Sequence, residues 1–346
     1  MTDVDNEMRC LLDLYRAMAP MDQLMHNLKS CSSYLTLEFQ DRFMQFVIQD
    51  PIADDFPPKQ SYTFRLLRLY IQEIERQGDD VSDVLMEEIL PNVCHKNASI
   101  GAIDLDELHH VTYRIPHPRG GSVDWTNDAA VHDRKNSVIT CRVAAAHNEV
   151  GMKLWEAGFF LAEYVLSHTD VFRGQRVMEL GAGVGFTGLV LASLPSVAAA
   201  VVLTDYAPVV MQNLRYNIEV NEHACRLQCP LVEAMLVDWT AWEWHDTPWD
   251  ILIAGDCVYD VAAFPAMVHV LATFLDADQK KSAIFASTLR NQATFDAFLK
   301  ELHVHAIDYD DITAEAVANM PRAFQYDNRG SIRLCRMTKA ATHETI

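Results

Sequence analysis

The chain has 346 residues, 50% of them hydrophobic, and a formal net charge of −20. This length allows one large domain with a smaller one beside it, and the apolar content can fill a sizeable core. Such an acidic balance argues against a broad phosphate-binding surface, so direct nucleic-acid binding is not expected. It suits a basic partner, such as a protein surface that carries lysines, or it only keeps the protein soluble.

The eight cysteines are scattered, with neither the spacing of a disulfide framework nor the two ligand pairs of a zinc site. We therefore expect reduced thiols in a cytoplasmic protein, and no metal. The first residues contain neither a basic nor an apolar segment, so no secretory signal is expected. No run approaches the roughly 18 consecutive apolar residues of a membrane span, so no membrane attachment is expected either.

Residues 1–108 are predicted to form a helical N-terminal domain. Apolar side chains recur at helical spacing in the segments 11–18, 39–47 and 64–74. A shorter helix is expected over 81–90, ending at the proline that follows. These stripes are explained by ordinary core packing, and the segment has no catalytic constellation. A domain of this kind would help to choose a partner or cover the flank of a sheet.

The remainder, 109–346, is predicted as a second domain that opens with a small hairpin in residues 109–150. Two alternating, β-rich segments, 110–115 and 137–143, are separated by a loop rich in proline, glycine, asparagine and aspartate. From residue 151 onward, apolar strands alternate with helices, which indicates an α/β core. Strands are expected at 177–180, 200–205, 235–239, 249–256, 282–287 and 331–337, and helices at 151–166, 189–194, 207–220 and 292–303.

A glycine-rich turn follows the first strand of this core. The strand carries Glu179 near its end and then breaks into Gly181, Gly183 and Gly185. Glycines here let the chain turn tightly and let a ligand lie against bare backbone at a positive helix end. The dinucleotide fingerprint needs a sixth-position glycine, where this chain has Phe186. The spacing is instead that of S-adenosylmethionine-dependent methyltransferases, the alternative being an ordinary glycine-rich turn of another doubly wound protein.

Acidic and aromatic residues follow the next strands. Asp205 ends the second strand, where its carboxylate can accept hydrogen bonds from both hydroxyls of a ribose. Asp238 and Trp239 end the third, where an acid can accept from the exocyclic amine of adenine while a ring packs on the base. Asp256 and Tyr259 follow the fourth strand, at the edge where an open α/β sheet binds its ligand. The later tryptophans Trp242, Trp244 and Trp249 are expected to pack under a loop.

Together these motifs resemble the family 16 protein methyltransferases. The motifs that carry the resemblance are Glu179-Leu-Gly-Ala-Gly-Val-Gly185, Asp205, Asp238-Trp239 and Asp256-x-x-Tyr259. The segment 155–158 resembles the helix that precedes the first strand in that family, and 287–291 resembles a later strand-end motif. The likeness covers residues 140–338. It implies a seven-stranded Rossmann-like sheet whose final strand is inserted antiparallel, with S-adenosyl-L-methionine as cofactor and S-adenosyl-L-homocysteine as product. The Asp-x-x-Tyr motif marks members that modify lysines of non-histone proteins.

The resemblance also implies roles for single residues. Asp256 and Tyr259 belong to the motif at the methyl-transfer mouth and are the predicted catalytic residues. Where relatives carry alanine before this aspartate, the chain has Gly255, and Cys257 replaces a plain aliphatic residue. The predicted cofactor-binding residues are Trp155, Glu179, Gly181, Ala182, Gly183, Asp205, Asp238, Trp239 and Gly255.

The N-terminal segment points to one branch of the family. Phe56-Pro-Pro58, followed by Tyr62 and Phe64, resembles the branch that methylates a lysine of translation elongation factor 2. The partner implied is therefore elongation factor 2, and the enzyme itself is predicted to be a monomer.

The chemistry requires a neutral lysine amine in line with the S–CH3 bond. A lysine has an unperturbed pKa near ~10.4, and burial in a narrow aromatic slot beside a sulfonium lowers it. Our hypothesis is that Asp256 orients the amine or a bridging water and that Tyr259 helps to form the slot. Two other interpretations stay open: a methyltransferase with a nucleic-acid, small-molecule or different protein substrate, and a non-catalytic cofactor-binding module.

Overall fold

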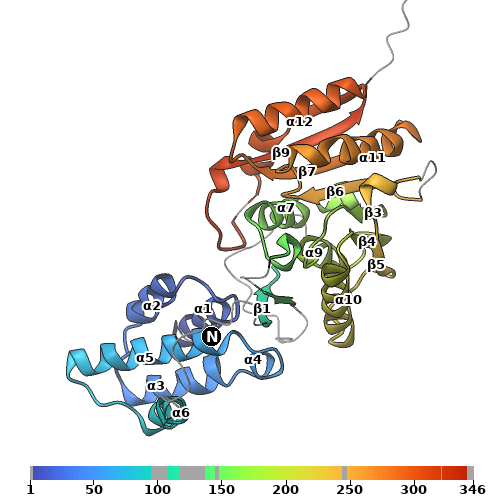
Figure 1. Ribbon diagram of the computed structural model, residues 1–346. Helices are drawn as coiled ribbons and strands as arrows, with labels where there is room; N and C mark the ends of the chain where they lie inside the picture. The colour runs from blue at the N-terminus through green and yellow to red at the C-terminus, as the bar shows by residue number, and fades with distance from the viewer. Residues whose placement is uncertain are drawn as a thin grey trace, which may run out of the picture. The chain divides into compact units, whose positions relative to one another are not determined.

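A computed structural model describes residues 3–94, 108–116, 137–144, 148–243, 248–320 and 322–340. The chain divides into two compact units (Figure 1). The main parts of the first are Met1–Arg114 and Thr140–Asn148, and the main part of the second is Glu149–Ile346. Among the described helices, none combines the length and the apolar character needed to cross a bilayer.

The first unit is built from helices around its own core. The predicted apolar stripes form that core, with Leu11, Phe43, Leu66 and Tyr70 fully or almost fully buried. The last helix continues through Pro91 instead of ending before it as predicted, although a proline inside a helix removes one backbone hydrogen bond and crowds the carbonyl four residues earlier. The helices are α1 (Asp3–Arg16), α2 (Met21–Ser30), α3 (Leu37–Phe43), the π-helical η1 (Met44–Ile48), α4 (Pro51–Asp55), α5 (Gln60–Gln77) and α6 (Asp83–Cys94).

The predicted hairpin strands are present as β1 (His109–Arg114) and β2 (Val138–Val143), which form a two-stranded sheet. The hydroxyls of Thr112 and Thr140 hydrogen-bond across it at 2.9 Å. On the other side, Arg114 pairs with Asp13 of α1 at 2.7 Å. Strand β1 therefore packs on the helical unit, while the domain boundary expected at residue 108 stays a prediction.

The second unit is built on a seven-stranded sheet with the order β5-β4-β3-β6-β7-β9-β8. Strands β3 to β7 run parallel, and β9 lies antiparallel between β7 and β8. This confirms the predicted Rossmann-like sheet with an antiparallel final strand. The strands are β3 (Arg176–Glu179), β4 (Ala200–Asp205), β5 (Val232–Leu236), β6 (Ile251–Gly255), β7 (Ser282–Thr288), β8 (Ile307–Asp311) and β9 (Ile332–Lys339).

Two strands differ from expectation. Strand β5 lies three residues before the predicted 235–239, because Asp238 instead caps the 3₁₀ turn η3 (Trp239–Ala241) by accepting from the Thr240 amide at 2.9 Å. Strand β8 was not predicted. Its sequence, Ile-Asp-Tyr-Asp-Asp, has one buried residue, because an edge strand exposes most of its side chains and needs no apolar alternation.

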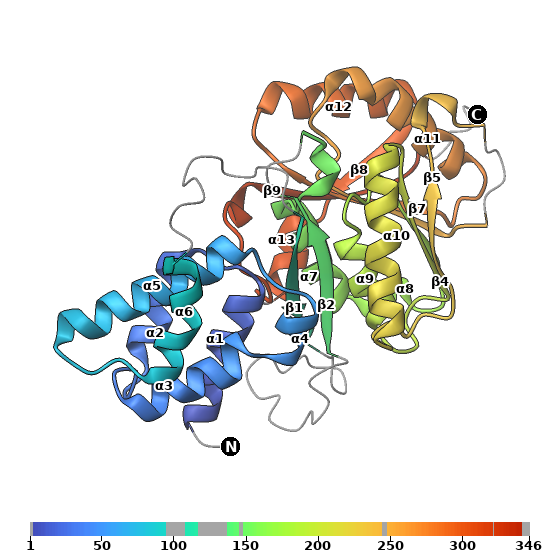
Figure 2. The ribbon, with the colours of Figure 1, turned by 60° about the horizontal axis from the view of Figure 1, so that its bottom comes forward.

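Helices cover both faces of the sheet (Figures 1 and 2). Helices α7, α9 and α10 lie on one face, and α11 and α12 on the other. The parallel strands β3, β4, β6 and β7, covered on both faces, are consequently apolar along most of their length, whereas the edge strand β5 has no buried residue. The helices are α7 (Glu156–Ser167), α8 (Thr169–Phe172), α9 (Phe186–Ser193), α10 (Pro208–His223), α11 (Phe264–Asp276), α12 (Gln292–Val304) and α13 (Thr313–Ala318).

Candidate active site

The glycine-rich turn joins β3 to α9 with three glycines in the left-handed region. The φ angles of Gly181, Gly183 and Gly185 are +58°, +56° and +84°. A Cβ on Gly183 would lie 3.0 Å from the Gly151 carbonyl oxygen, and a Cβ on Gly181 would lie 2.8 Å from Cys257 Sγ. Only glycine can make this turn without strain and crowding. The result is a bare backbone surface before α9, here called the cradle.

Glu179 lies beneath this turn. Its Oε2 accepts from the Gly188 amide of α9 at 2.9 Å, so the carboxyl stabilises the first turn of the helix. Burial raises the pKa of Glu179 to about 8. The structure thus places Glu179 as a support of the cradle, and its contact with the cofactor stays a prediction.

Asp205 stands at the carboxyl end of β4, directly against the glycine turn. Its Oδ2 accepts from the Gly183 amide at 3.2 Å, and its Oδ1 accepts from the Tyr206 and Ala207 amides at 2.8 and 3.2 Å. Burial raises the pKa of this carboxyl, and these three donors oppose the shift. Oδ2 has capacity for a further donor, which fits a ribose hydroxyl. The Ala182 amide donates to the Thr204 carbonyl at 2.8 Å, so Ala182 can offer a ligand its surface but not its N–H.

Trp239 lies against the same turn. Its Cζ2 atom would be 3.5 Å from a Cβ on Gly181, so the half-buried ring borders the cradle, and its contact with adenine stays a prediction. The neighbouring Asp238 is exposed and its Oδ1 holds the Thr240 amide and hydroxyl. Trp242 and Trp249, predicted to pack under a loop, are buried in a core cluster, and Trp244 lies outside the described residues.

Gly255 ends β6 under helix α7. A Cβ there would lie 3.1 Å from the Gly158 Cα, so the two backbones approach too closely for a larger residue to fit without displacement. The close approach of α7 thus gives a reason for glycine at this position, where relatives carry alanine. Cys257, two residues on, is buried, and its thiol donates to the Leu180 carbonyl at 3.4 Å.

Asp256 follows β6 with a φ of +59°, an unusual backbone conformation for a residue other than glycine. Its carboxylate is buried and receives four hydrogen bonds. Oδ1 accepts from the Thr288 amide at 3.1 Å and Arg290 Nη1 at 3.1 Å, and Oδ2 accepts from the Thr288 hydroxyl at 3.2 Å and Arg290 Nη2 at 2.8 Å.

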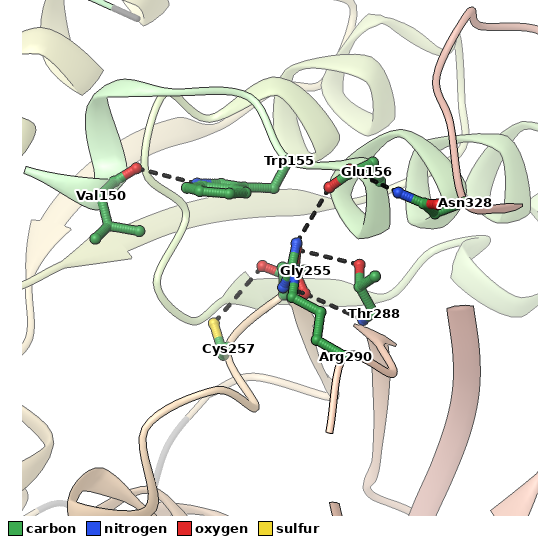
Figure 3. A network of polar contacts seen from close by, with 9 residues as sticks. Val150, Trp155, Glu156, Gly255, Cys257, Thr288, Arg290 and Asn328 are labelled. Carbon is green, nitrogen blue, oxygen red and sulfur yellow. Dashed lines mark hydrogen bonds and ion pairs between the residues drawn. The ribbon is translucent and has the colours of Figure 1, made fainter. Parts of the chain in front are cut away.

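Arg290 connects this carboxylate to helix α7 (Figure 3). Its Nη2 also donates to Glu156 Oε2 at 3.1 Å, and its guanidinium lies 5.4 Å from the centroid of the Trp155 ring. The Trp155 indole N–H donates to the Val150 carbonyl at 3.1 Å, which holds the ring from the opposite side. The sequence interpretation missed Arg290 as a site residue, although its position after β7, in the strand-end motif 287–291, was the available signal.

Tyr259 differs from Asp256 in its surroundings. The Tyr259 residue is 56% exposed, whereas the Asp256 residue is 7% exposed. The Asp-x-x-Tyr motif thus divides into a buried, fully bonded carboxylate and an open aromatic ring. Among the described residues, no three histidine, cysteine, aspartate or glutamate side chains gather as a metal site.

Two groups of predicted residues emerge from this geometry. Around the glycine turn the structure gathers Asp205 and Trp239, and around the end of β6 it gathers Asp256 and, through Arg290, Trp155. Both groups lie at the carboxyl ends of the central strands β3, β4 and β6, the edge at which an open α/β sheet binds ligands.

Comparisons with known proteins agree on one family. The model of the family described as lysine methyltransferase matches residues 135–305. An uncharacterized protein of Dictyostelium discoideum is 26% identical over 78% of this chain and 79% of its own. The protein-lysine N-methyltransferase EEF2KMT of Homo sapiens is 26% identical over 74% of each chain. The protein-lysine N-methyltransferase EFM3 of Chaetomium thermophilum is 26% identical over 78% of this chain and 84% of its own.

Proposed function

Because this chain belongs to the lysine methyltransferase family, we propose that its substrate is a lysine of translation elongation factor 2 and that it works in the cytoplasm as a monomer. Two observations support this substrate. The Phe56-Pro-Pro58 segment resembles the branch that acts on elongation factor 2. The likeness to the human enzyme EEF2KMT spans 267 residues, more than the family segment contains, so it extends beyond the methyltransferase part.

S-adenosylmethionine, the methyl donor of this enzyme, supplies a methyl group already activated on a sulfonium. We assign Asp205 to the ribose hydroxyls, because its Oδ2 faces the glycine turn with acceptor capacity to spare. Trp239 would pack on the adenine, with Asp238 beside it as the acceptor for the exocyclic amine. Trp155, held between Val150 and Arg290, would cover the opposite end of the cofactor.

The substrate lysine must reach the sulfonium as a neutral amine. We assign the slot to Tyr259, whose ring stands open at the end of β6 and can exclude water from a side chain laid against it. Removal from water lowers the pKa of the lysine from its ordinary value of about 10.4. Asp256 would set the electrostatic field at the mouth, because its oxygen atoms are already occupied by Thr288 and Arg290.

The experiment that tests this function is methyl transfer from labelled S-adenosylmethionine into purified elongation factor 2 and, in parallel, into a cytosolic extract. We expect one labelled protein of the size of elongation factor 2, with the label on lysine by peptide mass. An Asp205→Ala variant should lose more than tenfold in cofactor affinity and in transfer at limiting cofactor. Label on a lysine of another protein would refute the substrate, and label in RNA would refute the reaction class on this chain.

A further inference from the structure

The Asp256 carboxylate has no hydrogen-bonding capacity left for a substrate. A carboxylate offers about four lone-pair directions, and Thr288 and Arg290 occupy two on each oxygen. The side chain is 3% exposed, so the pairing with Arg290 is shielded from water on the carboxylate side. An incoming amine could bind this carboxylate only by displacing one of these donors.

Arg290 contacts three side chains at once, and they come from two places in the chain. Its bidentate bonds reach Asp256 after β6, a third bond reaches Glu156 in the first turn of α7, and its guanidinium lies over the ring of Trp155 (Figure 3). The planar guanidinium suits this combination of bidentate pairing and stacking, which a lysine could not reproduce in full. Its own side chain is 45% exposed, so the guanidinium remains in contact with solvent.

We propose that Arg290 is a positioning residue of the methyl-transfer site, holding Asp256 as a charge-balanced carboxylate and fixing Trp155 beside it. The inference rests on the proposed site, which places Asp256 at the mouth. It explains how a carboxylate can stand there without capturing the substrate as an ammonium ion. With its charge balanced by Arg290, Asp256 neither traps the lysine cation nor draws the sulfonium out of line.

The proposal predicts opposite effects for the two members of one ion pair. Arg290→Gln leaves the Asp256 carboxylate without its countercharge. The affinity for S-adenosylmethionine, whose sulfur is cationic, should therefore rise relative to the affinity for S-adenosylhomocysteine, whose sulfur is uncharged. Asp256→Asn leaves the Arg290 guanidinium with Glu156 alone, so the same preference should fall. We expect the ratio of the two dissociation constants to shift roughly fivefold towards S-adenosylmethionine in the first variant and roughly threefold away from it in the second.

The experiment is titration calorimetry of the full chain with each of the two cofactor forms. Arg290→Lys should restore the wild-type ratio to within about twofold, since it keeps the charge. The double variant Asp256→Asn/Arg290→Gln should also return to it, because removing one negative and one positive charge leaves the net charge of the Asp256, Arg290 and Glu156 cluster as in the wild type. The matched control is Arg173→Gln, which removes an arginine from another aspartate pair, at Asp170, on the surface of the same unit.

Equal losses of affinity for both cofactor forms, with the ratio unchanged, would show that Arg290 only supports the local fold and would overturn the inference. A double variant whose ratio stays shifted from that of the wild type would overturn it as well. Should Arg290→Gln not fold, the single Asp256→Asn variant still decides, because an unchanged ratio there refutes the charge balance. If the ratios shift as expected while elongation factor 2 receives no label, the substrate proposal fails and the role of Arg290 stands.

Discussion

At the scale of single residues, the site depends on positions where only one side chain fits. Gly183 combines a φ of +56° with a Cβ position 3.0 Å from the Gly151 carbonyl oxygen. Gly174 has a φ of +71° and no atom within 4 Å of its Cβ position. The two glycines share the left-handed backbone conformation and differ in steric crowding. Comparing substitutions at the two positions therefore separates the cost of backbone strain from the effect on the shape of the cradle.

Gly183→Ala is therefore expected to reduce both stability and cofactor binding. The left-handed conformation alone costs about 1–2 kcal/mol for an alanine, and the contact with Gly151 must then displace the turn. We expect the affinity for S-adenosylhomocysteine to fall more than tenfold by calorimetry. Gly174→Ala should lose similar backbone free energy in urea unfolding and keep its cofactor affinity. Equal affinity in both variants would contradict the assignment of the cradle.

The buried Glu179 gives a pH dependence whose sign follows from its environment. Its pKa is raised to about 8 in the folded protein from an ordinary 4.5, so the folded state binds more protons than the unfolded state between these values. The group consequently has no effect on stability below pH 4.5 and an increasing cost as the pH rises towards 8. Glu179→Gln should remove that cost and keep an acceptor for the Gly188 amide.

We expect the free energy of unfolding in urea of Glu179→Gln, taken relative to that of the wild type, to increase by more than ~1 kcal/mol between pH 5 and pH 8. A difference that stays constant over this range would mean that Glu179 titrates alike in both states. If the wild type instead became more stable relative to the variant as the pH rises, the sign would be reversed and the argument from burial would be refuted.

At the scale of the elements, helix α7 is tied to a distant part of the chain by Glu163. Its buried carboxylate accepts from the Ala323 and Phe324 amides at 2.7 and 3.0 Å and from the Tyr326 hydroxyl at 2.7 Å. Arg329 completes the set with an ion pair. The ring of Phe324 in turn packs on Phe186, the first residue of α9, at 5.1 Å between centroids. Helix α7, which begins after Trp155, and helix α9, which follows the glycine turn, thus both contact the segment 323–329.

Glu163→Gln should lower the free energy of unfolding by about 2–4 kcal/mol, because it leaves the partly buried Arg329 without its countercharge. The control is Asp170→Asn, which breaks an exposed pair with Arg173 in the same unit and should change little. Chemical denaturation of the two variants beside the wild type decides the matter. A loss no larger than that of the control would show that the backbone donors, and not the charge, hold the segment.

The elements that sequence reasoning located are those with a strong local pattern. Strands β3, β4, β6 and β7 contain apolar runs, and β9 places arginines between apolar residues, so their places could be predicted. Gly181 with Asp205 marked the cradle from the order of the motifs. Strand β8 was not found, since three of its five residues are aspartates, a residue type depleted in strands. The partnership of Asp256 with Arg290 was equally out of reach, because 34 residues separate them and only the adjacency of β6 and β7 in the sheet brings them together.

At the scale of the whole molecule, the net charge of −20 bears on how the enzyme associates with the proposed substrate. An acidic enzyme attracts a lysine-bearing surface over distances that salt screens, since the Debye length falls from about 14 Å at 50 mM salt to about 6 Å at 300 mM. We expect kcat/KM for elongation factor 2 to fall roughly fivefold over this range, mainly through association. Binding of S-adenosylhomocysteine, measured in the same buffers, should change less than twofold. A transfer rate that ignores salt would mean that the acidic surface only keeps the protein in solution, and that the substrate is selected by contacts instead of by charge.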